Sequence, residues 1–311
     1  MLQQLVLYKQ KPYSFYFVKT NYAILIKKEY FCTALIQPQM ITFPNAKINL
    51  GLDVVEKRPD GYHNLETVFY PIPLYDILEI TKSEDEFSFT MHNAEFEGGY
   101  NDNLVVKAYN ILAEDFEMPK VKMSLYKNIP TGAGMGGGSA DAAFALKMLN
   151  NIAGLSLSDE KLEEYAARLG ADCAFFIKNK PAYARGIGNI LSPVDCDLTG
   201  YYMVVVKPDI HISTKEAYAF VNPEHPENAL ADIINLPVKE WKGLMKNDFE
   251  KSVFAKYPSI MDVKEKLYGL GALYASMSGS GSAFFGIFEK ECDIDEVKRL
   301  FTDTFCQQWR F

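Results

Sequence analysis

The chain has 311 residues, 48% of them apolar and 14% aromatic, so it can bury a core large enough for two average-sized domains. Its formal net charge is −8. An acidic chain without a basic stripe is repelled by a polyphosphate backbone, which argues against nucleic acid as a main partner. No apolar run approaches the roughly 18 to 20 residues that span a bilayer, so we expect no membrane anchor.

The cysteines are scattered and form neither a CxxC pair nor a zinc-type Cys/His spacing: Cys32, Cys173, Cys196, Cys292 and Cys306. We therefore expect reduced thiols and a cytoplasmic protein. The sequence does not distinguish between a monomer and a homodimer.

The first 39 residues differ in composition from the rest. They carry five lysines against a single acid and lack the apolar region of a signal peptide. A strand-like run starts at Met40, so we expect residues 1–39 to be an N-terminal extension or a misassigned start. Two domains are expected after it, 40–194 and 195–311.

β-Branched and aromatic residues, interrupted by turn formers, predict strands over residues 41–55, 66–72, 77–82 and 86–91. A helix with one apolar face is predicted over 103–113, followed by a strand over 121–126. An alanine and leucine pattern then predicts a helix ending near Ile152. The next helix has Ser158 as its N-cap and ends at Gly170.

The C-terminal part mixes both kinds of element. Strands are predicted at 182–184, at 202–207 and as a hairpin-like pair around SMSGSGSAFFGIF. Helices are predicted at 213–220, 241–246, 260–268 and 293–301. Because strands and helices do not alternate strictly, the pattern favours an α+β fold over a doubly wound sheet.

Glycines are concentrated between Thr131 and Ser139, just before a helix: Gly132, Gly134, Gly136, Gly137 and Gly138. Such a loop can point successive backbone N–H groups into one concavity, and the helix start adds the positive end of its dipole, which suits a di- or triphosphate. The loop is neither a Walker A motif nor a dinucleotide fingerprint. A flexible turn beside a tightly packed helix start is the alternative.

Two charged residues lie in apolar surroundings, Lys47 in PNAKINLGL and Asp172 in GADCAFF. A carboxylate in such surroundings needs a partner. Taken alone, a surface lysine is the ordinary explanation of Lys47, and a capping or turn aspartate explains Asp172 as well as a functional carboxylate does.

Three motifs in order resemble those of the GHMP kinase superfamily. PTGAGMGGGSADAA resembles its ATP-phosphate motif, while PNAKINLGLDVVEKRPDGYHNLETVF and SMSGSGSAFFGIF resemble its first and third motifs. The combination of AKINLGL and RPDGYH is most similar to the 4-diphosphocytidyl-2-C-methyl-D-erythritol kinases of this superfamily. The resemblance implies a two-domain α+β fold, with an N-terminal ATP-binding α/β sandwich, a C-terminal ferredoxin-like domain and the site in the cleft between them.

By this resemblance the protein transfers phosphate from ATP to the 2-hydroxyl of 4-diphosphocytidyl-2-C-methyl-D-erythritol in the non-mevalonate isoprenoid route. Asp172 would orient or deprotonate the hydroxyl, and Lys47 would keep that carboxylate ionised and stabilise developing negative charge. ATP chemistry implies Mg²⁺, with Ser139 as the candidate protein contact, although Ser139 suits an N-cap equally well.

The resemblance also implies binding residues. Those on the ATP side are Pro130, the five loop glycines, Ser139, Asn103 and Lys127. Those on the substrate side are Tyr62 and His63 as a cytosine-recognition loop, Tyr218 across the base, and Asn49 and Thr214 as polar contacts. Gly279 and Gly281 would pack beside the phosphate loop. Without the resemblance, each of these is an ordinary surface or turn residue.

Two other functions stay open. A different superfamily kinase would act on homoserine, mevalonate or a sugar, and PDGYH argues against it. A non-catalytic nucleotide- or RNA-binding protein is the second, because the N-terminal fold also occurs in ribosomal and chaperone proteins. The acidic charge and the presence of both Lys47 and Asp172 argue against it.

Overall fold

The computed structural model describes residues 6–10, 13–17, 23–26, 40–94 and 99–311. The chain divides into two compact units, 1–39 and 40–311. In the first unit three short strands form an antiparallel sheet, β1 (Val6–Gln10), β2 (Tyr13–Phe17) and β3 (Ala23–Ile26). Cys32 lies outside the described residues. The origin of residues 1–39 stays a prediction.

The described part of the second unit contains three four-stranded sheets. The first has the order β4 (Met40–Thr42), β7 (Ile77–Lys82), β9 (Val121–Tyr126) and β8 (Ser88–His92). Strands β8 and β9 are parallel and the other neighbours are antiparallel. Parallel neighbours need a crossover, and helix α1 (Leu104–Ala113) provides it.

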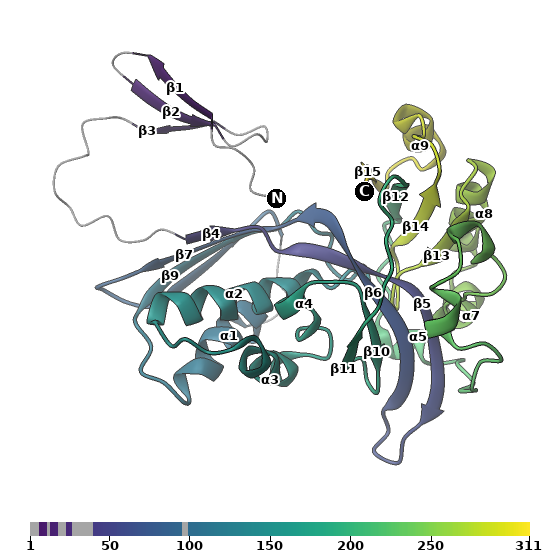
Figure 1. Ribbon diagram of the computed structural model, residues 1–311, viewed down its shortest axis with the longest axis horizontal. Coiled ribbons are helices and arrows are strands. Elements are labelled where there is room, and N and C mark those ends of the chain that lie inside the picture. The colour runs from purple at the N-terminus through teal and green to yellow at the C-terminus, as the bar shows by residue number, and fades with distance from the viewer. Residues whose placement is uncertain (1–5, 11–12, 18–22, 27–39, 95–98) are drawn as a thin grey trace. The chain divides into compact units, whose positions relative to one another are not determined.

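Helices cover one face of this sheet (Figure 1). They are α1 with α2 (Gly137–Ala153), α3 (Asp159–Leu169) and α4 (Phe175–Lys178). Their apolar faces and the sheet share one hydrophobic cluster that includes Leu78, Met123, Val105, Leu146 and Phe176. The start of α2 is thereby held against a packed layer.

The second sheet contains the two longest strands. Its order is β11 (Ile190–Pro193), β10 (Ala182–Arg185), β6 (His63–Tyr75) and β5 (Asn45–Lys57). In Figure 1, β5 and β6 run from the helical layer to the C-terminal sheet. The first ten residues of β5 are all buried, so polar side chains on this strand are buried with it.

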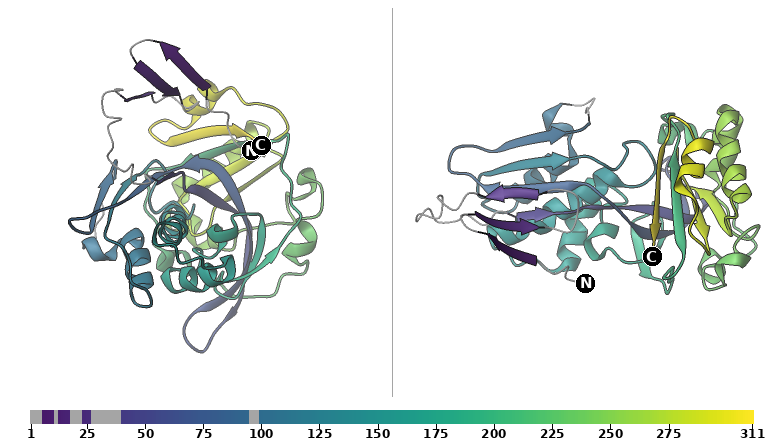
Figure 2. Two further views of the ribbon diagram at one scale, coloured as in Figure 1. Left: turned by 60° about the vertical axis from the view of Figure 1, so that its left-hand side comes forward. Right: turned by 90° about the horizontal axis from the view of Figure 1, so that it is seen from above.

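The third sheet has the order β13 (Tyr274–Met277), β14 (Phe284–Phe288), β12 (Tyr202–Lys207) and β15 (Phe305–Arg310). The helices between its strands include α7 (Phe249–Lys256), α8 (Met261–Gly269) and α9 (Ile294–Leu300). The right-hand view of Figure 2 shows the latter two on the outer side of this sheet. The order is that of a ferredoxin-like β-α-β-β-α-β unit, which confirms the α+β class.

The remaining helical pieces are short. They are α5 (Thr214–Ala217), α6 (Leu230–Ile233) and the 3₁₀ turns Tyr100–Asp102, Val238–Glu240 and Pro258–Ile260. The helix predicted at 241–246 is wrong, because this segment forms turns in which Trp241 and Met245 are buried. None of the helices in the described ranges is long and apolar enough to cross a membrane.

One hydrophobic cluster joins the two expected domains. It contains Ile48 of β5 and Val68 of β6 together with Val205 of β12 and Phe285 of β14. The opposite face of the third sheet, with Val204 and Phe284, packs in a separate cluster with helices α7 and α8. The domain boundary after residue 194 stays a prediction.

Candidate active site

The glycine loop connects β9 to α2. Gly134 and Gly136 have positive φ, and Gly136 is the N-cap of α2, so the N-cap role considered for Ser139 is wrong. A Cβ on Gly134 would lie 2.0 Å from the carbonyl oxygen of Ser278. Only glycine fits that position, because both the backbone conformation and the space exclude a side chain.

The turn that contains Gly279 and Gly281 packs against this loop. The Ser278 hydroxyl donates to the Gly134 carbonyl at 2.9 Å, and the Ala283 N–H donates to the Ala133 carbonyl at 3.2 Å. Two segments almost 150 residues apart in sequence therefore form one continuous wall, as the third motif predicted.

A cavity of about 730 Å³ opens over the loop. Its apolar part is formed by Met91, Leu104, Leu125 and Ile129. All nine residues expected on the ATP side line it: Asn103, Lys127, Pro130, Gly132, Gly134, Gly136, Gly137, Gly138 and Ser139. Backbone N–H groups at the start of α2 and an apolar recess thus share one space, which suits a nucleotide.

Lys127 is held there by two buried carboxylates that the sequence did not single out. Its ammonium pairs with Asp76 and, at 2.6 Å, with Asp141. Burial raises the pKa of Asp141 to about 7, although the Lys127 charge opposes this. The second oxygen of Asp141, Oδ1, has no hydrogen-bond partner among the described residues. The only signal in the sequence was a charged residue inside the apolar pattern SADAA.

Lys47 and Asp172 lie next to each other, 3.2 Å from Nζ to Oδ2. Lys47 is 3% exposed and Asp172 is 32% exposed, so the carboxylate can reach a ligand while the ammonium is enclosed. The ammonium also donates to Asn49 Oδ1 at 2.6 Å and to the Gly134 carbonyl at 3.3 Å. The alternative of a surface lysine is therefore excluded, and Lys47 lies beside Asp172 as the resemblance implied.

A second cavity of about 250 Å³ lies over this pair. Asn49, Thr214 and Tyr218 line it together with Lys47 and Asp172. It shares Gly134, Gly136, Thr214 and Ser280 with the larger cavity. The two spaces therefore adjoin at the glycine loop.

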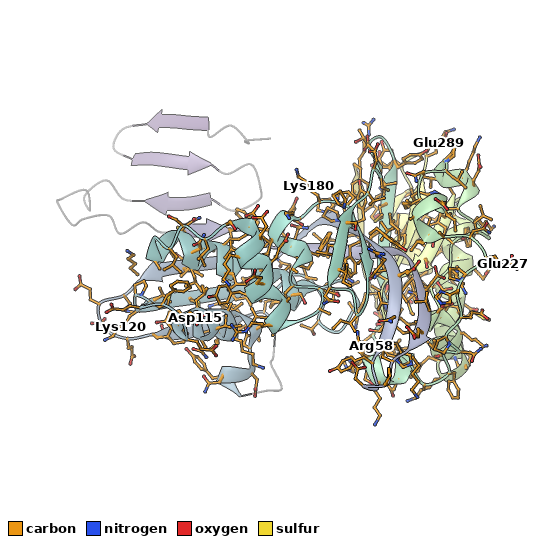
Figure 3. The ribbon with its side chains drawn as sticks, turned by 60° about the horizontal axis from the view of Figure 1, so that its bottom comes forward. Arg58, Asp115, Lys120, Lys180, Glu227 and Glu289 are labelled. Atoms are coloured by element: carbon orange, nitrogen blue, oxygen red, sulfur yellow. The ribbon has the colours of Figure 1, made fainter. Side chains whose placement is uncertain are left out.

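The predicted cytosine loop is only partly assembled. Tyr62 is 63% exposed in the turn between β5 and β6, which also contains Arg58, labelled in Figure 3. His63 instead stacks on Tyr218, with ring centroids 4.6 Å apart and an angle of 18° between the rings. Burial, with a smaller effect of the Lys57 charge, lowers the pKa of His63. Of Tyr62 and His63, only His63 stacks on Tyr218.

Ser139 lies in the first turn of α2 and lines the larger cavity. In the described ranges no cluster of three His, Cys, Asp or Glu residues could hold a metal ion. The oxygen ligands on this cavity include the Ser139 hydroxyl and the Asp141 carboxylate, and Mg²⁺ usually completes its shell with water and ligand oxygens.

Comparison with known proteins matches both parts of the chain. Residues 103–180 match the family model described as GHMP kinases N terminal domain, and residues 219–305 match the one described as GHMP kinases C terminal. The crystal structure of a 4-(cytidine 5'-diphospho)-2C-methyl-D-erythritol kinase superposes with a TM-score of 0.72 at 31% identity, covering 86% of this chain and 98% of that one. A mevalonate kinase from Methanococcus jannaschii, at 13% identity and a TM-score of 0.66, shares the fold.

Closely similar sequences carry one name. A 4-diphosphocytidyl-2-C-methyl-D-erythritol kinase from Bacteroides fragilis is 60% identical over 272 residues, which are 86% of this chain and 98% of the relative. A protein of the same name from Bacteroides thetaiotaomicron is 54% identical and is covered over its whole length. The chain belongs to the GHMP kinase family.

Proposed function

We propose that this chain transfers the terminal phosphate of ATP to the 2-hydroxyl of 4-diphosphocytidyl-2-C-methyl-D-erythritol and releases ADP. The observation that carries the proposal is the Lys47–Asp172 pair at 3.2 Å, located where the glycine-loop cavity meets the smaller one. The names of the relatives at 54–60% identity support the choice of acceptor.

On the donor side, the backbone N–H groups of the glycine loop and the first turn of α2 bind phosphate oxygens. The recess formed by Met91, Leu104 and Leu125 receives the base, with Asn103 and Lys127 at its edge. ATP, when bound, supplies the phosphoryl group. The fixed loop geometry contributes by holding that group in position, since phosphoryl transfer depends mainly on positioning and electrostatic stabilisation.

On the acceptor side, the Asp172 carboxylate accepts the hydrogen bond, and then the proton, of the attacking hydroxyl. A bond forms between that oxygen and the terminal phosphorus while the bond from phosphorus to the ADP oxygen breaks. The Lys47 ammonium keeps Asp172 ionised and stabilises negative charge on the transferred group. Asn49 and Thr214 orient the acceptor, and Tyr62, His63 and Tyr218 contact its cytosine.

Magnesium, when bound with ATP, neutralises phosphate charge. The Ser139 hydroxyl is our candidate for a protein contact to it, because this oxygen lies at the start of α2 on the larger cavity. The thiols of Cys173, Cys196, Cys292 and Cys306 are free, which fits a cytoplasmic enzyme.

Replacing Asp172 tests the proposal. Asp172→Asn keeps the shape but removes the proton acceptor, so we expect kcat to fall by about a thousandfold and the Kd for ATP to change by less than about threefold, because the carboxylate lies on the acceptor cavity. Asp262→Asn, an exposed aspartate on α8, is the matched control and should keep full activity. Unchanged turnover in Asp172→Asn would remove this residue from the mechanism.

A further inference from the structure

Thr67 lies beside the Lys47–Asp172 pair and has no part in the transfer described above. It belongs to β6, is completely buried, and lines the smaller cavity. A fully buried hydroxyl must be hydrogen-bonded, and the partners of this one lead directly to Lys47.

A bulge in β5 provides the first hydrogen-bond partner of the Thr67 hydroxyl. Asn49 pairs with Phe69 and Leu52 pairs with Thr67, so two residues of β5, Leu50 and Gly51, lie opposite one residue of β6. The carbonyls of the bulge are bound by side-chain hydroxyls: Tyr274 donates to the Leu50 carbonyl at 2.6 Å, and Thr67 donates to the Gly51 carbonyl at 2.5 Å.

This bond fixes the direction of the next one. A threonine hydroxyl has one proton, and a carbonyl can only accept, so Thr67 Oγ1 must act as an acceptor toward Asn49. It accepts from Asn49 Nδ2 at 2.8 Å. The amide of Asn49 is therefore held with its nitrogen toward Thr67 and its oxygen toward Lys47.

Lys47 needs that orientation, because an ammonium has three donors and no acceptor. Its neighbours are three acceptors: Asn49 Oδ1 at 2.6 Å, Asp172 Oδ2 at 3.2 Å and the Gly134 carbonyl at 3.3 Å. The shortest contact is the one to Asn49. A flipped amide would instead present its N–H₂ group to the ammonium and push it out of place.

We propose that Thr67 is a positioning residue of the phosphoryl transfer: its hydroxyl, fixed by the Gly51 carbonyl of the bulge, sets the amide of Asn49 and so aims the Lys47 ammonium at Asp172. The inference rests on the proposed function, in which Lys47 and Asp172 face the acceptor hydroxyl. In this inference Asn49 positions Lys47, in addition to making the substrate contact that the motif implies.

Substitutions of Thr67 separate the hydroxyl from the packing. Thr67→Val keeps the shape and removes the hydroxyl, so kcat should fall about 10- to 100-fold, as for a displaced catalytic group, with the KM for ATP within about threefold of wild type. Thr67→Ser keeps the hydroxyl and should stay within about threefold of the wild-type kcat. If the valine variant does not fold, Thr67→Ala against Thr67→Ser gives the same comparison, since these two differ only by the hydroxyl.

A double substitution tests the route through Asn49. Because Thr67 acts on Lys47 only through that amide, adding Thr67→Val to Asn49→Ala should lower kcat by less than about twofold beyond Asn49→Ala alone. Thr81→Val, at the exposed hydroxyl of β7 that lies 3.5 Å from the Lys122 carbonyl, is the matched control and should behave as wild type.

A readout independent of activity is the side-chain amide signal of Asn49 in ¹⁵N-asparagine-labelled protein, identified by its loss in Asn49→Ala. Its protons should exchange with water at least about tenfold faster in Thr67→Val than in wild type, because the hydrogen bond to Thr67 is lost. Unchanged exchange together with wild-type kcat in a folded Thr67→Val, or equal losses in the serine and valine variants, would overturn the inference. A wild-type chain that transfers no phosphate refutes the proposed function instead, and the exchange measurement still decides on the hydrogen bond.

Discussion

At the scale of single residues, burial distinguishes Lys47 and Lys127 from the other described lysines. Lys47 looks like an ordinary lysine in the sequence, and its importance comes from a strand that is buried over ten successive residues. The sequence indicated Lys47 and Asp172 by their apolar surroundings, but paired them only through the motif resemblance. Their contact joins positions 125 residues apart, which no local pattern contains.

The environment of Asp141 could not be predicted from the neighbouring sequence. An aspartate near a helix start is ordinarily a favourable partner of the helix dipole. Here it is enclosed by Lys127 and Asp76, which come from other parts of the chain. The sequence could name Lys127 as a nucleotide-side residue but could not provide its two carboxylate partners.

Asp141 also gives the protein a specific pH dependence. Its pKa rises from an ordinary value of 3.8 to about 7 on folding, so the folded state binds this proton more tightly than the unfolded chain does. This contribution to stability is fully present below about pH 4 and is lost as the pH rises through 7. Asp141→Asn cannot lose a proton there, and its melting temperature should fall by about 5 °C less than that of wild type between pH 5 and pH 8.

Thermal unfolding followed by circular dichroism at several pH values measures this. Asp85→Asn, at an exposed aspartate, is the control and should follow wild type. Parallel curves for wild type and Asp141→Asn would show that Asp141 does not titrate in this range.

At the scale of elements, the glycine loop and the Ser278–Ala283 turn act as one unit. The expected strands at 77–82 and 121–126 have the observed bounds, because the side-chain pattern that defines each strand lies within its own local sequence. Strand β15 was not predicted, since Gln307 and Gln308 interrupt the apolar residues of this edge strand. The contact between the two turns was expected only from the family motifs.

Alanine substitutions test this contact. Gly134→Ala introduces a Cβ that would lie 2.0 Å from the Ser278 carbonyl oxygen, so one backbone segment must move. Gly154→Ala has a similar positive φ, with no atom within 4 Å of the added Cβ. Both variants carry the backbone strain of about 1–2 kcal/mol, and Gly134→Ala alone should raise the KM for ATP, by about tenfold or more.

Steady-state kinetics with varied ATP distinguish the two variants, and thermal unfolding reports the shared strain. The account of the loop is contradicted if Gly134→Ala binds ATP as wild type does, or if Gly154→Ala weakens ATP binding equally.

At the scale of the whole second unit, β5 and β6 connect the two expected domains. They carry Lys47, Asn49 and Thr67, while the glycine loop comes from one side and the Ser278–Ala283 turn from the other. The sequence predicted the α+β class and the order of most elements. The boundary that it placed after residue 194 stays a prediction; one hydrophobic cluster draws residues from both sides of this position.

The central claim is that the larger cavity holds the phosphate donor and the smaller one a cytidine-linked alcohol. The most direct measurement is ADP release by the wild-type chain with ATP and, in turn, 4-diphosphocytidyl-2-C-methyl-D-erythritol, homoserine and mevalonate as acceptors. The account predicts a kcat/KM for the cytidyl acceptor at least about a thousandfold above the others, with one phosphorylated product formed per ADP. Equal or greater use of an acceptor that lacks cytidine, or no transfer to any of them, would contradict it.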